Sequence, residues 1–134
     1  MAGAIGQPDA HSGELPCAYV ELVAWASATE SELLDYACAH IPERAAHPKY
    51  LEILPELPKT AVGKVFKPDL RGRAIARIFD HALEEDGLKA RVAEVAQDKK
   101  RGLVAQLTRD SSNEDDAVQK TLGRFATPWD WVDE

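Results

Sequence analysis

A short run near the middle of the chain gathers residues whose types could act on an anionic substrate. The run reads Pro58-Lys59-Thr60-Ala61-Val62-Gly63-Lys64. A glycine directly before a lysine lets the main chain bend tightly and projects a mobile ammonium group, which suits a carboxylate or phosphate centre. Lys64 is therefore the candidate for a cation that acts on an anionic group.

Spacing alone does not separate this lysine from an ordinary surface lysine. An isolated Gly-Lys pair on a loop is typically solvated. The run is also not the phosphate-binding P-loop, because Val65 follows Lys64 where that motif has Ser or Thr, and the leading glycine is missing. The pair needs support from the rest of the sequence.

Basic residues are concentrated in this part of the chain. Only Asp69 opposes six of them, which are Lys59, Lys64, Lys67, Arg71, Arg73 and Arg77. The whole chain has a formal net charge of −7, and a general nucleic-acid binder needs cations clustered over a broad surface. We therefore exclude nucleic acid as the partner and expect either a local anion site or a solvated helix face.

Length and composition are typical of one compact domain. The chain has 134 residues, of which 45% are hydrophobic and 29% charged. No apolar run approaches the roughly 20 residues of a membrane span. The first residues have neither a basic segment nor a long apolar segment, so they do not predict a secretion signal, and we expect a cytoplasmic location.

The cysteines and histidines do not predict a metal site. Cys17 and Cys38 are far apart, without the close pairing of a metal knuckle or a redox motif, and we expect both to be small core residues. The histidines show no ligand spacing and are His11, His40, His47 and His81.

The apolar pattern predicts an α+β fold in which helices pack on a small sheet of about three strands, followed by a C-terminal β-hairpin and helix. We expect strands at 16–23 and 49–54, and a hairpin of strands at 89–96 and 103–108. Thr29 and Glu32 form a capping box for a helix that ends at Pro42. A second helix begins near Pro68 and stops at Gly87, and Ser112 or Asn113 caps a third. The segment 60–65 has no helical period and is predicted to be a loop.

The lysine run resembles the last core motif of the adenylate-forming superfamily. That superfamily comprises acyl-CoA and aryl-CoA synthetases, the adenylation domains of peptide synthetases, and luciferases. Its motif is Pro-Lys-Thr, two variable residues, Gly-Lys, and then a basic residue and Leu-Arg. The matching residues here are Pro58, Lys59, Thr60, Gly63, Lys64, Lys67, Leu70 and Arg71.

Two earlier segments extend the resemblance in the family's order. Residues 13–20 are similar to the family's Gly-Glu, Pro, Ala-x-Val strand, and residues 48–54 are similar to the strand that leads into the lysine loop. The trailing hairpin and helix resemble an extension of some fatty acyl-CoA synthetases. We therefore expect a C-terminal domain with its core at 1–88 and an extension of the same domain at 89–134.

The resemblance implies a reaction for the complete enzyme. ATP, with magnesium, joins a carboxylic acid to give an acyl-adenylate and pyrophosphate, and coenzyme A then takes the acyl group as a thioester. Lys64 is implied to be the catalytic residue that bridges the carboxylate and the α-phosphate. Pro58, Lys59, Thr60 and Gly63 are implied to form the substrate loop. The supporting residues are Lys67, Arg71 and Glu14, with salt bridges expected for Lys67 and Arg71 and a structural role for Glu14.

One departure from the family concerns the start of the domain. The family's domain opens with a hinge acid and a hairpin that serves the second half-reaction, and nothing before Ala4 matches them. We expect a large N-terminal adenylation domain, in cis or in trans, to bind ATP, magnesium and the acyl group, so that the isolated chain is inert and binds no cofactor. Two other interpretations stay open: a stand-alone binding or regulatory module, and recognition of Lys64 by a lysine acetyltransferase.

Overall fold

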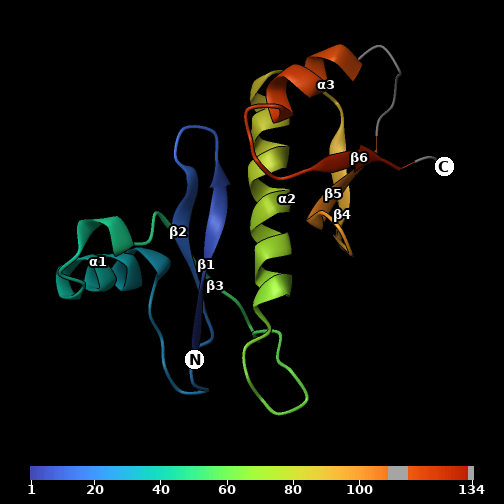
Figure 1. Ribbon diagram of the computed structural model, residues 1–134. Helices are drawn as coiled ribbons and strands as arrows, with labels where there is room; N and C mark the ends of the chain where they lie inside the picture. The colour runs from blue at the N-terminus through green and yellow to red at the C-terminus, as the bar shows by residue number, and fades with distance from the viewer. Residues whose placement is uncertain (109–114, 133–134) are drawn as a thin grey trace. The chain divides into compact units, whose positions relative to one another are not determined.

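A computed structural model describes residues 1–108 and 115–132 and shows an α+β fold, as the sequence predicts (Figure 1). The chain divides into two compact units. The first comprises Met1–Gln7 and Leu15–Arg71, and the second comprises Pro8–Glu14 and Gly72–Glu134. The predicted caps Ser112 and Asn113 lie outside the described residues.

The first unit is built on a three-stranded sheet. Its strands, in spatial order, are β1 (Ala2–Asp9), β2 (Gly13–Val20) and β3 (Tyr50–Ile53). β2 and β3 run parallel, with Cys17 opposite Tyr50 and Val20 opposite Ile53. The connection between them carries α1 (Glu30–His40), which contacts β3, and the short 3₁₀ helix η1 (Arg44–Ala46). The apolar core residues are Ile5, Cys17, Tyr19, Leu51, Leu54, Leu57 and Leu70.

The capping box of α1 is confirmed. Thr29 Oγ1 accepts from the Glu32 amide at 3.1 Å, and Glu32 Oε1 accepts from the Thr29 amide at 3.3 Å. The helix ends at His40, shortly before Pro42. Cys38, which we expected to be a core residue, is only half-buried, whereas Cys17 is fully buried.

The first strand of the sheet is missing from the sequence prediction, and β2 begins three residues before the predicted start at Pro16. The segment Ala2-Gly3-Ala4-Ile5-Gly6 contains few of the β-branched and aromatic residues that mark strands. Its burial nonetheless alternates, with Gly3 and Ile5 inside and Ala2 and Ala4 outside. The segment is therefore a strand with alternating burial, but its small residues give no signal of a strand in the sequence.

The helix α2 (Lys67–Glu85) begins in the first unit and continues into the second. It stops as predicted at Gly87, whose φ of 71° permits the left-handed turn that closes a helix. The Leu88 amide completes this stop by donating to the Leu83 carbonyl at 2.9 Å. The prediction of a helix between Pro68 and Gly87 is confirmed.

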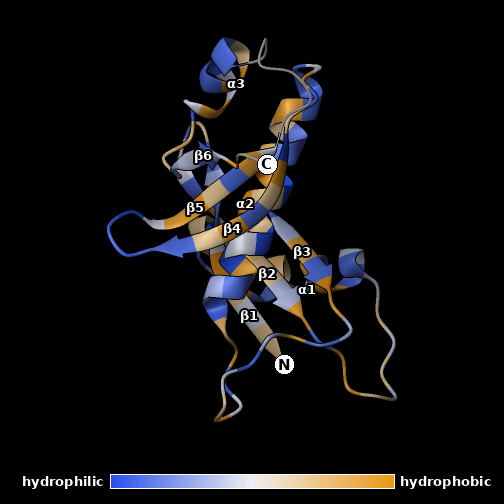
Figure 2. Ribbon diagram, turned by 90° about the vertical axis from the view of Figure 1, so that its right-hand side faces the viewer, coloured by the Kyte–Doolittle hydropathy of each residue, from blue (hydrophilic) through white to orange (hydrophobic). Residues whose placement is uncertain are grey.

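The second unit packs helices on another three-stranded sheet. Its elements after α2 are β4 (Arg91–Asp98), β5 (Gly102–Thr108), α3 (Asp115–Leu122) and β6 (Trp129–Trp131). β4 and β5 form the predicted antiparallel hairpin, and the turn that joins them is hydrophilic (Figure 2). β6 pairs parallel with β5, with Ala105 opposite Trp129, so the Trp129–Trp131 tail is a strand that the sequence analysis did not predict.

The core of this unit lies between the helices and the sheet. Phe79 is fully buried, and its ring centroid lies 5.2 Å from that of Phe125. Asp80 Oδ1 accepts from the Val92 amide at 2.8 Å and thereby ties α2 to β4. The buried residues of the cluster are Ile75, Phe79, Leu83, Ala90, Ala105, Leu107, Val118 and Leu122.

Candidate functional site

The predicted lysine loop is a tight hairpin that carries its own backbone pairing. Lys59 and Val65 form an antiparallel bridge. The Thr60 amide donates to the Lys64 carbonyl at 2.7 Å, and the Phe66 amide donates to the Pro58 carbonyl at 2.8 Å. Lys64 therefore lies on the exit side of a hydrogen-bonded ladder rather than on an irregular loop.

A three-residue turn closes this hairpin. The Gly63 amide donates to the Thr60 carbonyl at 3.0 Å, and Gly63 has a φ of 84°. A left-handed residue after such a turn returns the chain into the second strand, and glycine adopts this φ without the usual steric cost. The Lys64 amide donates to Thr60 Oγ1 at 3.2 Å. Thr60 and Gly63 thus fix the main chain at Lys64 from both sides.

The Lys64 side chain is exposed on this rigid support. Within residues 1–108 and 115–132, the structure gives its ammonium group no ion-pair partner. The neighbouring Val62 at the tip of the turn is 80% exposed. The arrangement can offer a positive charge, and an apolar tip beside it, to a surface or ligand in front of the loop.

The exit strand of the hairpin packs against β1. A Cβ atom added at Gly3 would lie 2.9 Å from Val65 Cγ1 and 2.8 Å from Leu70 Cδ1, closer than real Cβ contacts. Glycine at this position is what lets β1 approach Val65, the residue after Lys64. The base of the hairpin is therefore held by the sheet of the first unit.

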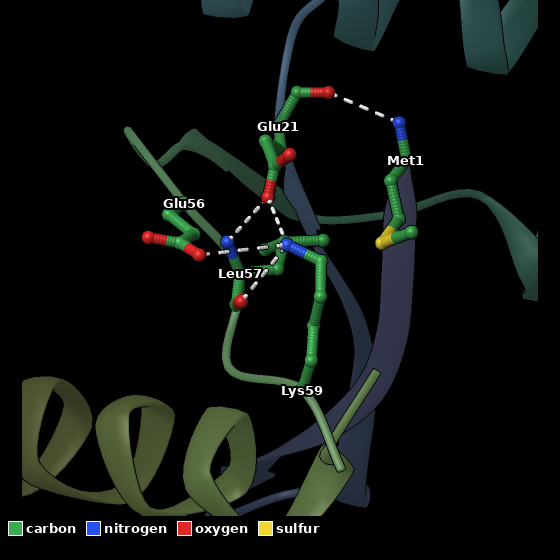
Figure 3. Close-up of polar contacts among 5 residues, drawn as sticks. All are labelled: Met1, Glu21, Glu56, Leu57 and Lys59. Carbon is green, nitrogen blue, oxygen red and sulfur yellow. Dashed lines mark hydrogen bonds and ion pairs between the residues drawn. The ribbon is translucent and has the colours of Figure 1, made fainter. Parts of the chain in front are cut away.

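The entry strand of the hairpin is held by Glu21, which directly follows β2 (Figure 3). Glu21 Oε1 accepts from the Leu57 amide at 2.7 Å and from Lys59 Nζ at 2.8 Å. The hydrogen bond from Lys59 holds the pKa of the Glu21 carboxyl group below its usual range, and the Leu57 amide acts in the same direction. Glu21 is ionised at neutral pH, and its carboxylate accepts hydrogen bonds from both of these donors.

The predicted residues do not all gather at this hairpin. Pro58, Lys59, Thr60, Gly63 and Lys64 lie on it, and Lys67 is the first residue of the following helix. Arg71 lies one turn further along α2, and both cations are exposed. In the part of the chain that the structure describes, neither has the ion-pair partner that we expected. Glu14 is an exposed residue of β2.

Glu21 is the residue at this site that the sequence analysis missed. It is one of 23 acidic residues and lies 38 positions from Lys59. No helical or strand period relates two residues at that distance. Its position directly after an apolar strand is the only signal in the sequence, and the same signal occurs at many strand ends.

Comparison with known proteins finds a family match in the first part of the chain. Residues 1–64, which run from the first strand to the exposed lysine, match the AMP-binding enzyme C-terminal domain. These residues belong to that domain family. The match ends at Lys64, so the AMP-binding enzyme C-terminal domain here contains Glu21 and the whole turn of the lysine hairpin.

The curated relatives of this chain are larger ligases. Over 84 residues the chain is 43% identical to the marinolic acid–CoA ligase of Pseudoalteromonas sp.. The matched region is 63% of this chain and 13% of that protein. It is 40% identical over 75 residues to the 2-methylpropanoate–CoA ligase of Humulus lupulus, covering 54% of this chain and 13% of that protein. The chain thus spans about an eighth of the length of either relative.

A solved structure shows the same fold over about half of this chain. The anthranilate–CoA ligase in complex with anthranoyl-AMP is 28% identical with a TM-score of 0.50, covering 57% of this chain and 15% of that chain. Its bound ligand is an acyl-adenylate. The names of these relatives mention different acids, so they do not single out the fatty acyl-CoA synthetases that the sequence resembles.

The described residues contain neither a candidate membrane-spanning helix nor a candidate metal cluster. No helix there is long and apolar enough to cross a membrane. No group of three or more His, Cys, Asp or Glu side chains in the same ranges could hold a metal ion. The lysine hairpin is the site on which we base a function.

Proposed function

We propose that this chain is the C-terminal lid domain of an acyl-CoA synthetase and that Lys64 assists the adenylation of a carboxylic acid by ATP. The observation that carries the proposal is an exposed lysine, without an ion-pair partner among the described residues, at the end of a hydrogen-bonded hairpin in an AMP-binding enzyme C-terminal domain. A fixed main chain with a free ammonium group suits a charge that acts on a substrate held elsewhere.

The chemistry proposed for Lys64 is electrostatic. A carboxylate oxygen attacks the α-phosphorus of ATP, the bond from that phosphorus to the pyrophosphate oxygen breaks, and acyl-adenylate and pyrophosphate result. Negative charge is shared between the attacking and departing oxygens in this transition state, and a preorganised cation nearby stabilises it. Loss of a comparable donor lowers the rate by about 10²- to 10³-fold.

Positioning is the second contribution of the hairpin. A carboxylate and a phosphate repel each other, and a cation between them reduces that repulsion while it aligns them. The Thr60 and Gly63 contacts limit the positions of the Lys64 main chain, so less freedom is lost when the ammonium group engages the substrate.

A large adenylation domain supplies the remaining parts in this proposal. It binds ATP, its magnesium ion and the acyl group, and the C-terminal domain closes over it in cis or in trans. Coenzyme A then receives the acyl group in a second step, and AMP leaves. The acyl substrate is set by the large domain, so the fatty-acyl preference that the resemblance implies stays a prediction.

Pyrophosphate exchange tests the proposal. Purified residues 1–134 should exchange no pyrophosphate into ATP with any of a panel of fatty and aryl acids. A chimera in which this chain replaces the matching segment of the C-terminal domain of the marinolic acid–CoA ligase, while the ligase keeps its own large domain, hinge and first hairpin, should restore exchange that the truncated ligase lacks. Robust exchange by the isolated chain, or a folded chimera as inactive as the truncated ligase, would contradict the proposal.

A further inference from the structure

The two lysines of the hairpin have different surroundings. The Lys64 ammonium group has no ion-pair partner among the described residues, whereas Lys59 Nζ lies 2.8 Å from Glu21 Oε1 and 3.4 Å from the Leu57 carbonyl oxygen. Only 26% of the Lys59 side chain and 25% of the Glu21 side chain are exposed. Lys59 is therefore directed into the body of its own unit and not toward a substrate in front of the loop.

We propose that Glu21 is a positioning residue for Lys64, acting through Lys59 and the Leu57 amide on the entry strand of the hairpin. This inference rests on the proposed function of Lys64. It also gives Lys59 a new role: it links the hairpin to Glu21 and is not a second cation for the substrate.

Glu21 can hold the hairpin because it is itself fixed at the edge of the sheet. Its amide donates to the Met1 carbonyl oxygen at 2.8 Å. Its own carbonyl oxygen accepts from the Met1 nitrogen at 3.0 Å (Figure 3). The preceding residue, Val20, accepts from the Leu54 amide at 2.8 Å and pairs with Ile53. The carboxylate thus projects from the point where β1, β2 and β3 meet.

The path from Glu21 to Lys64 consists of contacts between neighbouring groups. Glu21 fixes Leu57 and Lys59, the main chain of Lys59 pairs with Val65, and Thr60 pairs with Lys64 through both its amide and its hydroxyl group. A shift of the entry strand therefore moves the main chain from which the Lys64 side chain extends. A misplacement of about 1 Å is enough to cost a large factor in rate when a reacting group must be aligned.

Glu56 provides a matched control within the same segment. Its Oε1 lies 4.0 Å from Lys59 Nζ, and 82% of its side chain is exposed. Glu56→Gln removes one negative charge near Lys59, as Glu21→Gln does, but it breaks neither the Leu57 contact nor the short contact to Lys59. A difference between these two variants reports the geometry of Glu21 and not the net charge.

Amide hydrogen exchange on the 134-residue chain tests the positioning role without any catalytic assay. In Glu21→Gln and in Lys59→Met, the Thr60 and Phe66 amides, which Glu21 does not touch, should exchange about three- to tenfold faster, since a charged hydrogen bond is lost and local opening becomes easier. Glu56→Gln should leave both rates unchanged. The double variant should exchange no faster than Glu21→Gln alone, because Glu21→Gln already removes the charged contact that Lys59→Met breaks.

Half-reaction kinetics in the active chimera complete the test. Glu21→Gln should lower adenylation by about tenfold, with little change in transfer from a supplied acyl-adenylate to coenzyme A. Glu21→Asp should recover part of this loss. Two results would overturn the positioning role of Glu21. One is unchanged exchange of the Thr60 and Phe66 amides in Glu21→Gln. The other is adenylation by Glu21→Gln as fast as by the parent, while adenylation by Lys64→Ala is impaired. An unimpaired Lys64→Ala would instead contradict the proposed function.

Discussion

The amide of Lys64 donates a hydrogen bond to the side-chain hydroxyl of Thr60 at 3.2 Å, four residues earlier in the chain. The Thr60 amide in turn donates to the Lys64 carbonyl oxygen at 2.7 Å. Both polar groups of the Lys64 main chain are therefore bound to one residue. Thr60 thereby fixes the main chain from which the Lys64 side chain extends.

Replacement of the Thr60 hydroxyl tests this pair directly. Thr60→Val keeps the shape of the side chain and removes the acceptor of the Lys64 amide. A hydrogen bond of this kind contributes about 0.5–1.5 kcal/mol, so we expect adenylation in the chimera to fall by about three- to tenfold. Thr60→Ser retains the hydroxyl group and should stay within about twofold of the parent. Equal losses in Thr60→Ser and Thr60→Val would show that the hydrogen bond is not the cause.

Gly63 should be intolerant of a side chain for reasons of backbone conformation. Its φ is 84°, and a Cβ atom there would meet nothing within 4 Å, so Gly63→Ala adds backbone strain without a steric clash. We expect a loss of about 1–2 kcal/mol in the free energy of unfolding, measured with urea. Adenylation should fall as well, because the strained turn repositions Lys64.

Gly102 is the matched control for this substitution. It lies at the β4–β5 turn with a φ of 78° and equally open surroundings. Gly102→Ala should cost a similar free energy of unfolding while adenylation per folded molecule is kept. If adenylation fell equally in Gly63→Ala and Gly102→Ala, lost stability alone would explain the loss of adenylation.

The ion pair between Arg101 and Asp130 predicts how acid affects the second unit. Arg101 Nη2 lies 2.6 Å from Asp130 Oδ2, and this contact holds the pKa of the Asp130 carboxyl group below its usual range. A carboxyl group with a lowered pKa in the folded state binds fewer protons than in the unfolded chain. Its stabilisation is therefore complete above the ordinary Asp pKa of about 4 and is lost as pH falls through the lower folded value.

Acid titration of the second unit checks this sign. Asp130→Asn should move the midpoint of acid unfolding of the second unit to higher pH, as followed by tryptophan fluorescence. A salt concentration of 1 M should reduce the difference in midpoint between the variant and the parent, because salt screens the ion pair. Lys99→Ala, a change of charge in the same β4–β5 turn but outside the Arg101–Asp130 pair, serves as the control. A midpoint that stays in place for Asp130→Asn would show that the pair does not contribute.

Phe79 should be the most sensitive position of the second core. Its side chain is fully buried and packs beside Phe125. Phe79→Ala should reduce the free energy of unfolding by about 3–5 kcal/mol, because it removes buried apolar surface and leaves a cavity. Val62→Ala, at a side chain that is 80% exposed, should change it by less than about 0.5 kcal/mol. Chemical denaturation of both variants gives the comparison.

Local signals in the sequence were sufficient for several elements. The Thr29–Glu32 capping box and the stop at Gly87 act through contacts between residues close in the chain, and the structure contains both. The apolar periods of α2 and of the β4–β5 hairpin were equally readable. These elements were predictable because each is determined by a few neighbouring residues.

The parts that sequence reasoning missed depend on distant contacts. The strand β6 is three residues long and forms only because β5 offers an edge to Trp129. The strand β1 has small residues that carry little strand propensity, and Gly3 is explained only by the approach of Val65 and Leu70. Likewise, Glu21 meets Lys59 through the sheet and not through any sequence spacing.

The most direct test of the account is Lys64→Ala in the active chimera, with the two half-reactions measured separately. Adenylation should fall by at least about 10²-fold, while transfer from a supplied acyl-adenylate to coenzyme A is largely kept, as expected for a contact made only in the first transition state. Circular dichroism should show an unchanged fold, since Lys64 is exposed. An equal fall of both half-reactions in a folded variant, or no change in either, would contradict the role of Lys64.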